Sequence, residues 1–458
     1  MLLRTRKREH RDSPERLLGF SDALFSIAIT FLALDLGDLP TLDSGEAIHD
    51  FLVEHLSDYA VYFATFLVVG FMWWRHRLVF RNIRYRTPAI SWLNVFILAL
   101  VAMLPYPASL LSASFGLGIS LSALLLPLTL ASYALWVLFE LARQQHVMMP
   151  DVTEPTVTYV RSTVLSTSII MTIGLTFAGL SWALESETWF YVSLASLTLL
   201  LIAPPVLSKW VFPRPDVYAA TDVRDGSDEK PEVDVEARES GLNWWDKLRL
   251  ESEGMRFAIF SDGVFAISAT ILALQLRPPD VDRGTISTEV ILKNIAQVPW
   301  YAYLVTFLLI GLFWTHHVRL FEKIVRSDTV LLWLNLIVLM FVAFLPMPSE
   351  LLELGVSNTV SPLLLYLTTI SAISVFMSAT RIYANHATGV EAQLSQSSRQ
   401  RNAQTIRAIW FSASFVLPTI MVALTQVGTW SIAIPILLIS RPILLRLLRP
   451  DLVDTDDE

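Results

Sequence analysis

Residues 16–34 read RLLGFSDALFSIAITFLAL, and residues 256–274 read RFAIFSDGVFAISATILAL. The two stretches share the pattern Arg-x-x-x-Phe-Ser-Asp, followed by Phe, Ile, Thr and Leu-Ala-Leu at matching places, 240 residues apart (256 − 16). Each predicts a long apolar helix that carries an aspartate near its start. Burying an ionisable group among so many apolar side chains is costly, so such a residue is a functional hypothesis by default.

The composition predicts a polytopic membrane protein. Hydrophobic residues make up 53% of the 458 residues and charged residues only 17%, whereas soluble domains have about 25% charged residues. The apolar residues fall in blocks of roughly 20 separated by charged loops, as membrane-spanning helices do. The chain has no cysteine, which excludes disulfides, thiolate metal ligands and cysteine nucleophiles.

Twelve apolar stretches are long enough to be spans, six in each half of the chain. We expect an all-α membrane protein built as two parallel six-helix repeats, because an even number of spans leaves both repeats in the same orientation. The predicted spans are residues 17–36, 59–77, 89–111, 117–141, 163–184 and 190–212, then 255–276, 300–320, 331–348, 360–382, 406–427 and 429–445.

Shorter motifs also occur once in each half. Trp-Trp-Arg-His at 73–76 answers Trp-Thr-His-His at 314–317, so Trp73 matches Trp314 and His76 matches His317. Trp-Leu-Asn occurs at 92–94 and again at 333–335, and Leu-Pro-Tyr-Pro at 104–107 answers Leu-Pro-Met-Pro at 345–348. Self-similarity at a fixed separation indicates an internal repeat.

Loop charges predict the orientation of the spans. Arginines gather in the N-terminal arm and in the loops after the second and fourth spans, while aspartates and glutamates gather after the first and fifth. Because positive loops stay in the cytoplasm, we expect cytoplasmic termini and a cytoplasmic linker. The predicted parts are 1–212 (first repeat, with 1–16 as an arm), 213–253 (acidic linker and interfacial helix), 254–448 (second repeat) and 449–458 (acidic tail).

A stripe of small, Ile, Thr and Leu residues runs along one face of each first helix, at positions i, i+4, i+7 and i+11. Such a stripe could line a narrow path, and it equally suits packing between membrane helices, where small residues and Thr are favoured. Spacing alone leaves both readings open. The stripes are Ala23, Ile27, Thr30 and Leu34 in the first copy, and Gly263, Ile267, Thr270 and Leu274 in the second.

Asp22 and Asp262 lie off these stripes, near the cytoplasmic ends of their helices. Arg16 and Asp22 stand roughly 240° apart around a helix, so they cannot pair along it. We expect a buried polar cluster in each repeat that holds helix register, with direct ion binding as the alternative. The clusters are Arg16, Phe20, Ser21, Asp22, Trp73 and His76, and Arg256, Phe260, Ser261, Asp262, Trp314 and His317.

The duplicated Arg-x-x-x-Phe-Ser-Asp motif resembles that of the transmembrane protein 175 family of potassium channels, which are endolysosomal in animals and have shorter prokaryotic relatives. The resemblance covers the membrane part, not the linker or tails. It implies an all-helical fold without a re-entrant pore loop, and a homodimer in which four first helices line one pore. It also implies selectivity for potassium, with proton conduction as a further possibility known from animal members.

The same resemblance assigns roles to particular residues. The hydrophobic constriction would be Ile27 and Ile267, which gate by dewetting, and the hydroxyls associated with selectivity would be Ser26, Thr30 and Thr270. At the place of Ser26 the second repeat has Ala266, so a complete ring of serines is absent. We expect permeant K⁺ but no cofactor, no resident metal and no nucleic-acid partner. The expected location is a prokaryotic cell membrane, or an endosomal or lysosomal membrane for an animal protein.

The rival prediction is a secondary transporter of a small solute or ion, which parallel six-helix halves would also fit. Transporter sites favour broken helices, and the best candidates for a break are the proline pairs at 105/107 and 346/348. An enzyme is not expected, because no nucleotide-binding, hydrolase or metalloprotease motif occurs.

Overall fold

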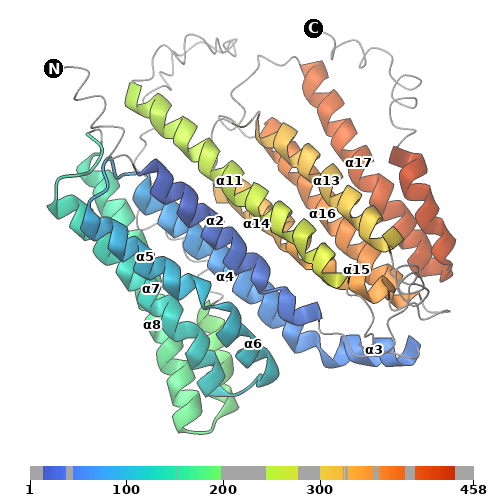
Figure 1. Ribbon diagram of the computed structural model, residues 1–458, viewed down its shortest axis with the longest axis horizontal. Coiled ribbons are helices and arrows are strands. Elements are labelled where there is room, and N and C mark those ends of the chain that lie inside the picture. Colours follow the sequence, from blue (N-terminus) through green and yellow to red (C-terminus); the bar gives the residue numbers. More distant parts are fainter. Residues whose placement is uncertain are drawn as a thin grey trace, which may run out of the picture. The chain divides into compact units, whose positions relative to one another are not determined.

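The computed structural model describes residues 14–37, 45–150, 152–197, 244–276, 300–322, 324, 329–353, 360–386 and 398–438. These residues form helices and their connections, with one isolated bridge between Ile83 and Met148. The helices divide into two compact units, residues 1–32 with 57–260, and residues 33–56 with 261–458. Figure 1 labels the helices of both units.

The first unit contains the first helix and the four spans that follow. These are α2 (Glu15–Phe31), α4 (Leu56–Phe80), α5 (Pro88–Ala102) continued by α6 (Pro105–Ala113), α7 (Gly118–Gln144) and α8 (Glu154–Ala183). α7 packs along both α5 and α8, and these three helices lie side by side in Figure 1. α2 packs on α5 and α6, so its polar residues face the third span.

The second unit repeats this order of packing. α11 (Trp244–Gln275) begins in the first unit and ends in the second, where α14 (Thr329–Phe344) packs on α16 (Ser361–His386), and α16 packs on α17 (Ser398–Thr425). α13 (Trp300–Phe321) and α15 (Pro346–Glu353) complete the group. Shorter elements are η1 (Leu34–Gly37), α3 (Gly45–Glu54) and η3 (Gly428–Ile432). The sequence analysis expected no helix at α3.

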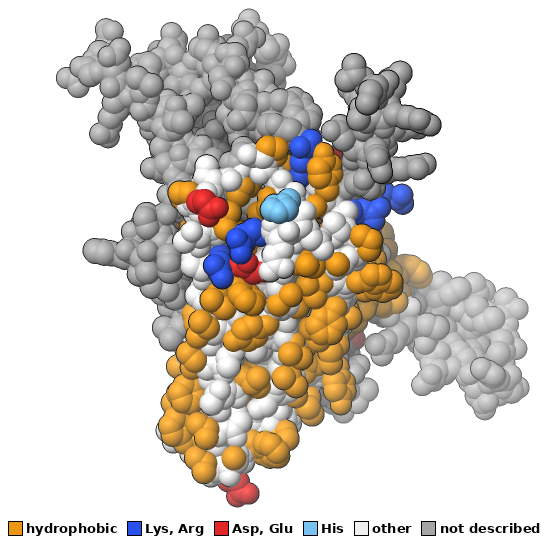
Figure 2. All heavy atoms as spheres, turned by 90° about the vertical axis from the view of Figure 1, so that its left-hand side faces the viewer, with side chains coloured by type: hydrophobic (Ala, Val, Ile, Leu, Met, Phe, Trp, Pro, Cys, Tyr) orange, Lys and Arg blue, Asp and Glu red, His pale blue; other side chains and the backbone are white. Residues whose placement is uncertain are grey.

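The surfaces of these helices are those of membrane spans. In the part of the chain that the structure describes, nine helices are long and apolar enough to cross a membrane. Figure 2 shows one face on which hydrophobic side chains cover most of the described length, while basic and histidine side chains gather toward one end and acidic side chains lie at both ends. Large apolar residues such as Trp92, Leu126 and Ile173 are exposed, as a lipid-facing surface requires.

Three spans differ from their predicted form. Residues 89–111 were predicted as one helix, but α5 ends at Ala102 and α6 restarts at Pro105, because proline has no N–H and its ring displaces the carbonyl four residues earlier. α14 and α15 are interrupted in the same way before Pro346. The first helix was predicted to reach residue 36, yet α2 ends at Phe31, and a turn and the η1 helix follow.

Several predicted segments fall outside the described residues. The structure describes helix at residues 187–197, which reaches into the predicted span 190–212, and at residues 428–438, which reaches into the predicted span 429–445. The arm up to residue 13, most of the linker and the tail 449–458 lie outside the described residues. The twelve-span, two-repeat layout therefore stays a prediction. Residues 244–253, expected to form a separate interfacial helix, are the first turns of α11.

Candidate functional site: the polar clusters of the first helices

Asp22 lies in the first of two polar clusters, fully buried on α2. The carboxylate receives an indole hydrogen bond from Trp73 on α4, with 2.8 Å between Nε1 and Oδ1. Arg256 on α11 contacts it with two nitrogens, Nη2 at 2.7 Å from Oδ1 and Nε at 2.9 Å from Oδ2. Such a bidentate, charge-assisted pair is both strong and geometrically specific. This ion pair holds α2 against α11.

A hydrogen-bonded relay continues from this ion pair to the third span. Arg256 Nη2 lies 3.1 Å from His76 Nδ1, and His76 Nε2 lies 2.7 Å from Asn94 Oδ1. Asn94 Nδ2 donates to Ser21 Oγ at 3.0 Å, and Ser21 Oγ donates to the Leu17 carbonyl at 2.8 Å. Because arginine can only donate, His76 Nδ1 must accept, which makes the ring neutral with its proton on Nε2. Every bond in the relay then has one donor and one acceptor.

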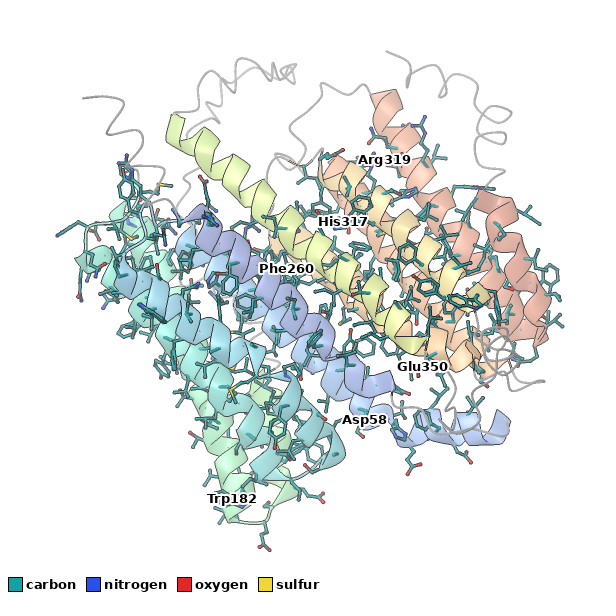
Figure 3. All side chains as sticks on the ribbon, viewed as in Figure 1. Asp58, Trp182, Phe260, His317, Arg319 and Glu350 are labelled. Carbon is teal, nitrogen blue, oxygen red and sulfur yellow. The ribbon has the colours of Figure 1, made fainter. Side chains whose placement is uncertain are left out.

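The second cluster repeats part of this arrangement. Trp314 Nε1 on α13 donates to Asp262 Oδ1 at 2.8 Å, as Trp73 does to Asp22. His317 Nε2 lies 2.7 Å from Asn335 Oδ1, and Asn335 Nδ2 donates to Ser261 Oγ at 3.2 Å. His317 and Arg319 lie toward the same end of α13 (Figure 3). The same residue types, at spacings that differ by at most one residue, therefore make the same bonds twice.

The two clusters differ in their arginines. Sequence analysis assigned one arginine to each cluster, Arg16 to the first and Arg256 to the second. Instead Arg256 contacts Asp22, and Arg16 is exposed and has no ion pair among the described residues. Six residues separate Arg16 from Asp22 on one helix, too far around it for a contact. Asp262, which accepts a hydrogen bond from Trp314, is exposed.

Aromatic packing supports the first cluster. The Phe260 ring stacks on Trp73 with 4.0 Å between centroids and 14° between planes. Phe257 packs edge-on against the same indole, at 5.7 Å. Trp73, Phe260 and Asp22 are fully buried, so the ion pair is enclosed by rings on the side of α11. Low polarity around the pair strengthens each hydrogen bond in it.

The predicted stripes are only partly accessible in the single chain. Ala23, Ile27 and Leu34 are exposed, whereas Thr30 is buried, with its hydroxyl bonded to the Ser26 and Ile27 carbonyls. On α11, Thr270 and Leu274 are exposed and Gly263 and Ile267 half-buried. Leu34 lies in η1, beyond the end of α2.

Ser26 does not lie on the accessible face. It is fully buried, and its hydroxyl lies 2.7 Å from the Asp22 carbonyl and 2.9 Å from the Phe260 carbonyl of α11. The residue therefore belongs to the packed contact between two helices in this chain.

Sequence reasoning left Asn94, Asn335 and Phe257 out of the candidate site. The two asparagines occur in the repeated Trp-Leu-Asn motif, and a side-chain amide at the same place of two apolar spans was the sequence signal that could have identified them. Both are buried, and a buried amide needs hydrogen-bond partners. Phe257 had no such signal, because the second half has Phe where the first has Leu17.

Apolar helices of spanning length, together with a polar cluster on each of the two first helices, define a polytopic α-helical membrane protein. The sequence model described as endosomal/lysosomal potassium channel TMEM175 matches this chain twice, at residues 16–105 and 256–346. The chain belongs to the TMEM175 family of ion channels. Both matches begin at the motif arginine and end in the third span, so they include every residue of the two clusters.

The chain is also similar to individual proteins of known name. A potassium channel from Streptomyces collinus is 33% identical over 171 residues, which is 35% of this chain and 82% of that protein. The endosomal/lysosomal proton channel TMEM175 of Gallus gallus is 28% identical over 353 residues, 73% of this chain and 66% of the chicken protein. A solved TMEM175 homolog from Chamaesiphon minutus, titled a lysosomal potassium-selective channel, is 24% identical with a TM-score of 0.34, over 41% of this chain and 98% of that one.

Proposed function

We propose that this protein is a potassium-selective channel whose pore is lined by α2 and α11 from two copies of the chain. The observation that carries the proposal is the pair of first helices, each held at its head by the same Asp–Trp and His–Asn–Ser bonds and each presenting an isoleucine on an accessible face. Bacterial relatives named as potassium channels support potassium as the permeant ion, and animal relatives named as proton channels support proton conduction as a second activity.

The constriction is formed by Ile27 and Ile267. Ile27 is 42% exposed in the single chain, an unusual position for an isoleucine that faces neither a core nor another helix of its unit. Four such side chains around an axis form a narrow apolar ring, which closes by excluding water. Ala23 and Gly263, on the same faces, leave space at the mouth, and Thr270 supplies a hydroxyl beyond the ring.

The polar clusters have a structural role in this proposal. Asp22 is fully buried and saturated by Arg256 and Trp73, so it holds the pore helix in register rather than contacting the ion. Conduction of K⁺ through such a pore requires no bound metal or cofactor.

The transporter alternative depends on broken helices. The third spans are interrupted at Pro105 and Pro346, as those of a transporter could be. In contrast, α2 and α11 run unbroken from Glu15 to Phe31 and from Trp244 to Gln275.

The test is the reversal potential of purified protein in a planar bilayer, with potassium on one side and sodium on the other. The wild type should shift toward the potassium potential, and Ile27→Asn/Ile267→Asn should carry a larger and less selective current. Ile173→Asn on the exposed face of α8 is the matched control and should leave selectivity unchanged. Absence of current from folded wild type and double variant, or solute uptake that needs an ion gradient, would favour the transporter.

A further inference from the structure

The second unit contains a basic cavity between three of its helices. The cavity has a volume of about 190 Å³ and is lined by residues of α13, α16 and α17. Arg319, Arg381 and Arg407 reach it from one helix each. His316 lies one turn before Arg319, which Figure 3 shows near the end of α13. Among the described residues that line the cavity, no side chain is acidic.

Buried groups form the rest of the lining. Met377 and Phe411 line the cavity and are both buried. The Phe411 ring stacks on the His316 ring with 4.4 Å between centroids. Ser378 Oγ donates to the Ala408 carbonyl at 2.7 Å, which ties α16 to α17. The basic side chains are therefore mounted on helices that are packed and bonded together.

The first unit shows what an anion does at the corresponding place. There the Glu140 carboxylate of α7 forms ion pairs with Arg161 of α8, at 2.7 Å, and with Arg143 of its own helix, at 3.1 Å. Arg143 follows Glu140 by three residues, as Arg381 follows Ser378 by three residues. The second unit thus has a serine where the first has a carboxylate.

The second arginine of each unit corresponds as well. Arg161 and Arg407 are each followed by a serine five and seven residues later, at 166 and 168 and at 412 and 414. Each lies on a helix that packs along the helix of the first arginine, α8 on α7 and α17 on α16. The second unit therefore keeps both arginines of the ion-pair site, and its cavity lies where the first unit supplies its own carboxylate.

The size of the cavity and the surface of α13 limit the kind of ligand. Sites that enclose a drug-sized molecule measure roughly 300–1,000 Å³, so a cavity of about 190 Å³ suits a single small anionic group. Val305 and Leu308 precede His316 and Arg319 by eleven residues each, about three turns, and so share their faces of α13. Their side chains are 51% and 68% exposed, as a helix face in contact with an acyl chain would be.

We propose that this cavity binds the phosphate of an anionic phospholipid, in the place that the Glu140 carboxylate has in the first unit. Arginine matches phosphate oxygens bidentately, and basic cavities between membrane helices accept lipid headgroups on the cytoplasmic side, which this end of the spans is predicted to face. A terminal phosphate carries a charge of about −1.5 to −2, which suits three arginines better than a phosphodiester does. A soluble phosphate has the same headgroup chemistry but no acyl chain to contact Val305 and Leu308.

Binding of short-chain lipids to the purified full chain in detergent tests the site. Dioctanoyl phosphatidic acid should bind saturably, and about tenfold or more tightly than glycerol phosphate or dioctanoyl phosphatidylcholine. Arg381→Gln/Arg407→Gln should weaken binding of phosphatidic acid about tenfold or more, because each lost charge-assisted bond contributes about 1.5–3 kcal/mol and 1.4 kcal/mol is tenfold. The matched control is Arg143→Gln/Arg161→Gln, the equivalent pair of the first unit, which should leave binding unchanged. Thermal midpoints without lipid show that each variant is folded.

Two further variants separate the headgroup from the acyl chain. Ser378→Glu supplies the carboxylate of the first unit and should abolish binding of phosphatidic acid while all three arginines remain. Leu308→Ser should weaken binding of phosphatidic acid and leave the weaker binding of glycerol phosphate unchanged.

Three results would overturn the inference. The first is equal binding of phosphatidic acid by the wild type and by Arg381→Gln/Arg407→Gln. The second is an equal loss in the first-unit control. The third is equal affinity for phosphatidic acid and glycerol phosphate, which would assign the cavity to a soluble phosphate. None of these measurements uses ion current, so the inference holds or fails independently of the proposed channel function.

Discussion

Asp22 and Asp262 are equivalent residues of a duplicated motif, but their surroundings differ in the single chain. Asp22→Asn would leave the Arg256 guanidinium buried without a counter-charge, and breaking such a pair costs about 3–5 kcal/mol. We expect a large fall in the thermal midpoint measured by size-exclusion chromatography after heating. Asp262→Asn, whose carboxylate is exposed, should instead leave the chain stable. Equal losses of chain stability from both substitutions would contradict the asymmetry.

The relay to the third span gives a second prediction for single residues. Asn94 accepts from His76 and donates to Ser21, so Asn94→Leu leaves the buried Nε2–H of His76 without an acceptor and removes one of the two bonds of Ser21 Oγ. A buried group left without a partner costs about 1–3 kcal/mol. We expect Asn335→Leu to have a comparable effect, because Asn335 bridges His317 and Ser261 in the same way.

Thermal midpoints of both asparagine variants check this, with Asn94→Gln as the control that keeps the amide but moves it by one methylene. Unchanged midpoints would mean that water replaces the amide. That result would contradict a relay whose hydrogen bonds are made by protein groups alone.

At the scale of elements, helix ends depend on backbone chemistry that hydropathy does not measure. The spans at 59–77, 117–141, 300–320 and 360–382 appear as helices at nearly the predicted places, because long apolar runs between charged loops have few alternatives. The third spans are broken where proline removes a hydrogen-bond donor. The prolines are visible in the sequence, but the hydropathy of the whole apolar run predicts one uninterrupted span. The end of α2 at Phe31 has no comparable local signal, since residues 32–34 are still apolar.

Close approach of two helices supplies a prediction at this scale. A Cβ on Gly118, the first residue of α7, would fall closer than 3.0 Å to backbone atoms of Ala178 and Trp182 on α8. Gly118→Ala should therefore lower stability by about 1–3 kcal/mol, as overpacking does. Gly179→Ala on α8 is the matched control, because nothing lies within 4 Å of its Cβ position. There we expect no loss, or a gain of about 0.5–1 kcal/mol from the more helical residue.

Thermal midpoints of the two glycine variants should therefore move in opposite directions or differ clearly. Equal behaviour would show that α7 and α8 can separate at this point without cost.

At the scale of the whole molecule, the candidate site was predictable as a set of residues but not as a set of pairs. Repetition identified Asp22, Trp73 and His76, and helical geometry excluded Arg16 as the partner of Asp22 on its own helix. That the partner is Arg256, 234 residues away along the chain, depends on which helices pack together. Packing between repeats is a long-range property, and periodicity within one helix carries no information about it.

The role of Ser26 is likewise determined by packing between helices and not by the local sequence pattern. Its hydroxyl lies 2.9 Å from the Phe260 carbonyl, across the contact between α2 and α11. The second repeat has Ala266 there, exposed in the single chain, so the proposed contact between two copies lacks this bond. In the dimer of the proposed function, we expect Ala266→Ser to place a hydroxyl on the exposed face of α11, where it donates across the contact with the second copy. A net hydrogen bond contributes about 1 kcal/mol, less when the hydroxyl is shared with its own helix.

We therefore expect Ala266→Ser to lower the dissociation constant of the dimer roughly 2- to 5-fold, since 1.4 kcal/mol corresponds to tenfold. Subunit counting by single-molecule photobleaching, over a dilution series in lipid vesicles, measures this. Ala266→Val, which adds apolar volume without a donor, is the control and should not strengthen association. If position 266 instead lines the pore, the serine would complete a hydroxyl ring and shift the potassium reversal potential while leaving the dimer unchanged. A serine that tightens the dimer at constant selectivity assigns the position to the interface, because one hydroxyl bonded across a helix contact is not free to replace the hydration of a passing ion.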